Sequence, residues 1–108
     1  MTDKSQIKWI GLVEVFGPRN KTLSEEKPKG AFVNVIALAC SEQEFFSRVR
    51  EALEELGFDI LDLEDVEPYA ERTKKYKIDP KLKEMAAKID SKNPIGFGTF
   101  HMYRPEVE

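Results

Sequence analysis

The longest hydrophobic stretch of the chain spans residues 31–40, where odd and even positions are both apolar and Asn34 is the one polar exception. A short run of this kind, rich in branched and aromatic residues, is typical of a strand that is covered on both faces. Such a strand belongs inside a sheet. We therefore predict that residues 31–40 form the centre of the fold.

Directly after this strand, the spacing of apolar residues changes to that of a helix. Ser41 and Glu44 have the S-x-x-E spacing of a capping box, in which each side chain accepts a hydrogen bond from a free backbone N–H of the first turn. Gly57 suits the left-handed residue just past a helix end. One face of the predicted helix carries Phe45, Val49, Ala52, Leu53 and Leu56.

The remaining apolar patterns are shorter. They predict a strand over 7–16, a strand over 58–66, one or two helical turns within 69–78, a helix that begins at Asp79-Pro80, and a strand over 95–103. The order of elements is then β-β-α-β-α-β. This order predicts an α+β fold: a two-layer sandwich with a four-stranded, mostly antiparallel sheet and helices on one face, ferredoxin-like or related.

The length of 108 residues fits a single domain, 1–108. We expect tails at 1–6 and 105–108, and a mobile loop at 17–30, where the residues are mostly polar or charged and include two prolines. No apolar run approaches the roughly 20 residues of a membrane span. The single cysteine excludes an internal disulfide and favours a reducing compartment, so we expect a cytoplasmic protein.

The distribution of charge changes the functional picture more than the net charge of −3 does. Residues 41–67 hold ten acidic and two basic side chains, whereas residues 72–92 hold eight basic and three acidic ones. Such a division favours oriented binding of a charged partner, although solvated helix surfaces can have the same pattern. The predicted partner-binding residues are Arg72, Lys74, Lys75, Lys77, Asp62 and Glu64.

Candidate chemistry is concentrated on the last predicted strand. His101 is the one side chain that titrates near neutral pH without a shift, and with Tyr103 it is a candidate for catalysis. A structural role for a single histidine is the alternative, because no catalytic set is assembled around it in the sequence. The predicted ligand-binding residues are Asn34, Gly96, Gly98, Thr99 and His101. We expect no metal site and no cofactor, since the chain has one histidine and one cysteine and lacks a phosphate-binding glycine motif.

Three functions are compatible with these patterns. We expect a non-catalytic protein-binding domain whose partner is another protein or a second copy of the chain, in the manner of an immunity protein, an inhibitor or a regulator. The alternative is a small-molecule-binding or enzymatic domain that uses the last-strand face around His101. The third is nucleic-acid binding through the basic segment 72–77, against which the acidic total of the chain argues.

Overall fold

The computed structural model of the chain describes residues 6–17 and 29–103. Residues 1–5 and 105–108 of the predicted tails, and residues 18–28 of the predicted loop, lie outside the described residues. The elements are β1 (Ile7–Gly17), β2 (Lys29–Ala39), α1 (Glu42–Glu55), β3 (Asp59–Pro68), α2 (Tyr69–Lys75), α3 (Pro80–Lys88), β4 (Ile95–Phe97) and β5 (His101–Tyr103).

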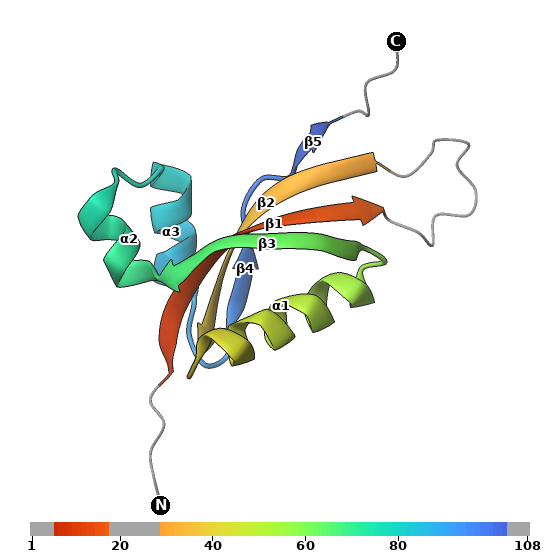
Figure 1. Ribbon diagram of the computed structural model, residues 1–108. Helices are drawn as coiled ribbons and strands as arrows, with labels where there is room; N and C mark the ends of the chain where they lie inside the picture. The colour runs from red at the N-terminus through yellow and green to blue at the C-terminus, as the bar shows by residue number, and fades with distance from the viewer. Residues whose placement is uncertain (1–5, 18–28, 104–108) are drawn as a thin grey trace, which may run out of the picture.

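The strands form one antiparallel sheet in the order β3-β1-β2-β4, and β5 occupies the same outer position as β4 because both pair with β2 (Figure 1). The sheet therefore has four positions, as predicted, and the α+β class is confirmed. The ferredoxin-like topology itself is not confirmed. The chain begins with the β1–β2 hairpin, whereas a ferredoxin-like domain has the order βαββαβ.

The core lies mainly between the sheet and α1. Phe45, Val49 and Leu53 of α1 are fully buried against alternate residues of β1 and β2. A second, smaller cluster lies on the opposite face of the sheet, where Ile10 and Ile36 contact α3. The two clusters together bury both faces of β2, as its unbroken apolar sequence requires.

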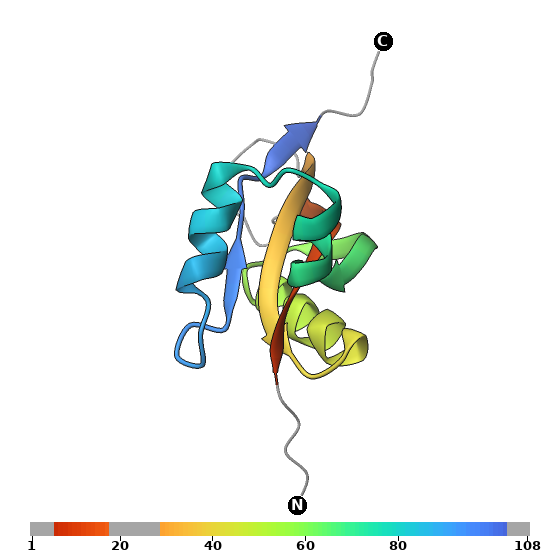
Figure 2. The same ribbon diagram turned by 90° about the vertical axis from the view of Figure 1, so that its left-hand side faces the viewer.

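The helices are divided between the two faces of the sheet, whereas we had predicted them on one face. In Figure 2, α3 and α1 lie on opposite sides of β2. The physical reason is that α1 already covers one face when the chain leaves β3, so the connection from β3 to β4 at the other edge crosses the free face. In the described part of the chain, no helix is long and apolar enough to cross a membrane.

The predicted start and end of α1 are confirmed at the level of single hydrogen bonds. The Glu44 amide donates to the Ser41 hydroxyl at 3.1 Å, and the Cys40 amide donates to the Glu44 carboxylate. Gly57 has φ 93°, in the left-handed region that favours glycine. A side-chain cap of this kind contributes about 1 kcal/mol to stability.

The last predicted strand, 95–103, is interrupted in the structure. Phe97 pairs with Val35 and His101 pairs with Phe32. Between these two pairs, the three edge residues 98–100 lie opposite only two residues of β2, 33 and 34. The extra residue is a β-bulge, which rotates the following side chains to the other face of the sheet. Strict alternation along 95–103 would place Gly96 and His101 on opposite sides, and the bulge places them on the same side.

Candidate functional site

Cross-strand pairs show which side chains share the face that carries α2 and α3. Directly opposite residues in antiparallel strands point to the same side of the sheet. Ile10, Ile36 and Gly96 form one such row, and it lies beneath α3. The rows that follow along β1 and β2 point to the same side, because side chains alternate with a period of two.

None of the residues in these following rows belongs to the buried cluster beneath α3. One row consists of Asp62, Glu14, Phe32 and His101, and the next consists of Glu64, Leu12 and Asn34. We call these seven residues the open face. Asp62, Glu64 and His101 are exposed, and the other four are half-buried. The structure thus brings two predicted partner-binding acids and two predicted ligand-binding residues onto one surface.

Carboxylates crowd together at the β3 end of the open face. Hydrogen bonding to Asp62 and the negative charges of Asp62, Asp65 and Glu14 raise the pKa of the Glu64 carboxyl. Like charges that face each other across strands repel. This part of the open face therefore favours a positively charged neighbour.

Two of the three basic side chains of α2 surround one carboxylate beside the open face. The Lys75 ammonium lies 2.7 Å from the Glu67 carboxylate, and the Arg72 guanidinium also donates to it. These hydrogen bonds lower the pKa of Glu67, and the bond from Lys75 has the larger effect. Arg72 also donates to the backbone carbonyl of Asp65 at 2.6 Å. The ion-pair network therefore ties α2 to β3.

Asp65 itself is the one described non-glycine residue with a positive φ, 56°. It lies in an irregular part of β3, where the pairing with β1 shifts between Ile10 and Leu12. Aspartate tolerates the left-handed region better than most residues. The Arg72 hydrogen bond holds the carbonyl of this bulged residue in place.

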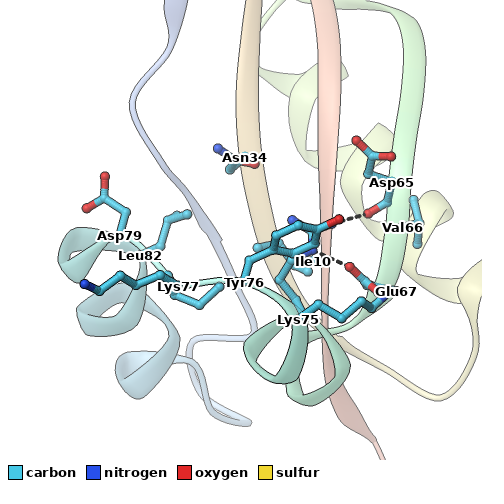
Figure 3. A pocket seen from close by; sticks show the side chains of 12 residues that line it. Ile10, Asn34, Asp65, Val66, Glu67, Lys75, Tyr76, Lys77, Asp79 and Leu82 are labelled. Atoms are coloured by element: carbon cyan, nitrogen blue, oxygen red, sulfur yellow. Dashed lines mark hydrogen bonds and ion pairs between the residues drawn. The ribbon is translucent and has the colours of Figure 1, made fainter.

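A hollow of about 590 Å³ lies between this network, the start of α3 and the sheet. Figure 3 shows Asn34 on β2 facing the hollow, with Tyr76 and Asp65 on one side and Asp79 and Leu82 on the other. Lys77 lines the hollow as well. Lys74 lies apart, exposed, with its ammonium 3.6 Å from the Glu71 carboxylate. Three of the four predicted basic residues, Arg72, Lys75 and Lys77, thus line one hollow.

A second hollow, of about 600 Å³, lies beside the first and shares Asn34, Asp79 and Leu82 with it. Its other lining residues include Gly98, Thr99 and His101, so it brings together four of the five predicted ligand-binding residues. The fifth, Gly96, does not line it. A Cβ atom at position 96 would lie 2.9 Å from Met85 Cγ, because α3 packs directly on this glycine.

His101 lacks an adjacent carboxylate in its row. Its direct neighbour is Phe32, and Glu14 lies one strand further. Asp79 shares the second hollow, but its carboxylate accepts the Lys81 amide at 2.8 Å as the cap of α3. The side chain of Tyr103 lies outside the described part of the structure. Within the described ranges, no group of three or more His, Cys, Asp or Glu side chains is arranged to hold a metal ion.

Glu14 and Asp65 are among the residues of this site that the sequence did not predict as site residues. Glu14 is one of two charged residues, with Lys8, in the mostly apolar strand 7–16, and a charge within such a strand is a signal that can be read from the sequence. The role of Asp65 depends on a bulge, for which the sequence has no local signal.

The comparisons with known proteins add no assignment. No protein-family model matches the chain. No curated protein and no solved structure shows significant similarity to it either.

Proposed function

We propose that the chain is a non-catalytic protein-binding domain that binds a basic region of its partner through the open face. One observation carries the proposal: Glu14, Asp62 and Glu64 lie together on one face of the sheet, and the hydrogen bond with Asp62, followed by the negative charges of its neighbours, raises the pKa of Glu64. A cation from a partner relieves the repulsion among these acids, so the same charges that destabilise the free surface favour the complex.

The neighbouring basic residues strengthen this interpretation. Arg72 and Lys75 share the Glu67 carboxylate, so their charge is partly neutralised within the molecule. The acids of the open face therefore dominate the surface beside the sheet. The cytoplasmic location expected from the single cysteine, and a partner of the inhibitor or regulator class, are parts of this proposal. Binding of this kind weakens as salt rises, because exposed charges are screened within about 8–10 Å at moderate ionic strength.

The experiment is a pull-down from lysate of the source organism at low and at high salt, with two charge-reversed variants. Asp62→Lys with Glu64→Lys changes the open face. Glu51→Lys with Glu54→Lys makes the same change in net charge on exposed positions of α1. We expect a stoichiometric partner that is captured at low salt by the wild type and by the α1 variant, and lost in the open-face variant. Equal capture by both variants contradicts the proposal.

A second candidate function is the binding of a small polar ligand in the hollow around Asn34. The observation that favours it is the assembly of Asn34, Gly98, Thr99 and His101 around one space whose volume falls in the range of ligand sites. A thermal-shift screen of metabolites tests it, with Asn34→Ala and His101→Ala as variants. A compound that stabilises the wild type and neither variant supports this function, and equal shifts in all three proteins dismiss it.

A further inference from the structure

β3 forms one edge of the sheet. It pairs with β1 on one side, and no described strand pairs with it on the other. The Leu63 amide donates to the Asp62 carboxylate at 2.9 Å, so a side chain satisfies this donor where a further strand is absent. β3 is ten residues long, whereas the opposite edge consists of two strands of three residues each. The longer edge of the described sheet is therefore β3.

On one side of this edge lies a groove with an apolar floor and a polar rim that includes Glu42, Gln43, Ser47 and Asp62. It has a volume of about 840 Å³ and runs between β3 and the first half of α1. No residue of β1 or β2 lines it, so it opens on the outer side of β3. Leu61, which lines the groove, is 54% exposed. The other apolar residues that line it are Phe46, Ile60, Leu63 and Val66.

On the other side of the same edge, the side chains are acidic. Asp62 and Glu64 point towards the open face, and Asp59 joins them because it pairs with Phe16, two residues along β1 from Glu14. The two sides of β3 thus differ in chemistry: the α1 side offers most of the apolar surface, with Glu42 and Asp62 at its rim, and the open-face side is negatively charged.

Resting on the proposed function, we propose that the partner adds an extended segment to the edge of β3, with apolar and basic residues in alternation. Side chains of an added strand alternate between the two sides of the sheet. One set enters the groove beside α1, and the other set meets Asp62 and Glu64. Main-chain hydrogen bonds then form along β3, including one from the Leu63 amide.

Charge decides between a partner segment and a second copy of the chain. Pairing of β3 with β3 of another copy brings the acidic side chains of two strands together, and like charges facing each other across strands are destabilising. A basic segment would instead place positive side chains opposite the acids of β3, and opposite charges attract across strands. The occupant that fits both sides of the edge is therefore a basic, apolar strand from a different protein.

The test uses the full chain and three short peptides with blocked ends. The first alternates lysine and valine; the second has the same sequence with a backbone N-methyl group on every residue, so that neither edge of the peptide can pair; the third alternates glutamate and valine. N-methylation retains charge and apolar surface but prevents strand pairing. We expect the first peptide to bind at least about tenfold more tightly than the other two, because several hydrogen bonds or charge pairs are lost in those. Equal binding of the first and second peptides overturns the inference.

Amide hydrogen exchange and protein variants locate the bound peptide. The first peptide should slow exchange of the Leu63 amide and leave the outer amides of β5 unchanged. Leu61→Gln should weaken binding several-fold, whereas Leu56→Gln, at a leucine that is 52% exposed and outside the groove, should not. Glu64→Lys should abolish the preference for lysine over glutamate peptides.

The two proposals fail in different ways. If the partner from the pull-down depends on Asp62 and Glu64 but leaves the exchange of the Leu63 amide unchanged, strand addition is wrong and protein binding by the open face stands. If capture is independent of these acids, the proposed function itself fails. A dimer of the chain that protects Leu63 without any peptide also overturns the inference, because it names a second copy as the occupant.

Discussion

Replacement of Gly96 by alanine tests how closely α3 packs on the sheet, and with it our exclusion of Gly96 from the ligand-binding hollow. A Cβ atom at this position would lie 2.9 Å from Met85 Cγ, 3.1 Å from Met85 Sδ and 3.2 Å from Ile89 Cδ1. These separations are shorter than the roughly 3.5–4.0 Å at which carbon atoms attract each other best. One methyl group therefore forces Met85 or α3 itself to move.

The size of the effect follows from two opposing terms. Overpacking of a core by an added methyl group costs about 1–3 kcal/mol. Alanine in place of glycine inside a strand returns roughly 0.5–1 kcal/mol, because the unfolded chain loses conformational freedom. We therefore expect Gly96→Ala to lower the free energy of unfolding by about 0.5–2 kcal/mol, which corresponds to roughly 2–9 °C in Tm for a chain of this length.

Gly98→Ala is the matched control. A Cβ atom there would lie 3.4 Å from its nearest neighbours, the Asn34 carbonyl oxygen and Leu82 Cδ2, which is ordinary contact. We expect this variant to stay within about 0.5 kcal/mol of the wild type. Urea unfolding followed by the fluorescence of Trp9, the single tryptophan, measures both. Its indole N–H donates to the Ala39 carbonyl at 3.1 Å, so its surroundings change on unfolding.

Met85→Ala completes a double-mutant cycle. If Met85 causes the strain, Gly96→Ala should be less destabilising in the Met85→Ala background, with a coupling energy of about 0.5–2 kcal/mol. A Gly96→Ala variant as stable as the wild type, with no coupling to Met85, refutes the reasoning, since α3 would then lie farther from β4.

Three further predictions concern charge and capping. The pKa of Glu64 is raised by Asp62, Asp65 and Glu14, so the stability of the fold falls as pH rises from the ordinary glutamate pKa through the raised one. Glu64→Gln should therefore raise Tm at neutral pH and lose this gain in acid. An unchanged Tm at neutral and at acid pH would show that the acids do not crowd. The pKa of Glu67 is lowered by Lys75 and Arg72, so the stability that Glu67 contributes is present above the ordinary glutamate pKa and is lost as pH falls through the lowered one. In thermal scans, Glu67→Gln should lower Tm at neutral pH but not in acid. The control Glu71→Gln, at a residue that pairs with exposed Lys74, should have little effect. Ser41→Ala should lower the free energy of unfolding by about 1 kcal/mol in urea titrations, with Ser47→Ala in the middle of α1 as the control that should not.

The local signals in the sequence predicted most elements correctly, because caps and turns depend on neighbouring residues alone. Ser41 begins α1, and Asp79 with Pro80 begins α3, as their spacing indicates. The helical spacing of Leu82, Met85, Ala86 and Ile89 in the sequence also indicates an inward face for α3, and Ala86 and Ile89 are buried against the sheet.

The placement of helices could not be read in the same way. Which face a connection crosses depends on what already covers the sheet, and that is a property of the whole chain. The continuous apolar sequence of β2 required cover on both faces, and this pattern was the one clue that α1 and α3 lie on opposite sides.

Bulges explain why some side chains face a different side of the sheet than strict alternation predicts. They also create the surface on which both proposals rest. Strict alternation along β3 predicts that Asp59 faces away from Asp62 and Glu64. The register shift between Glu14 and Val15 adds one residue to β3, and Asp59 turns to the same side as the other two acids. The residue that remains unmatched is Leu61, which is exposed at the groove. One bulge thus concentrates the acids on the open face and supplies an apolar residue to the other side. The two-sided chemistry of the β3 edge is therefore a consequence of pairing between distant strands, and no pattern within β3 alone predicts it.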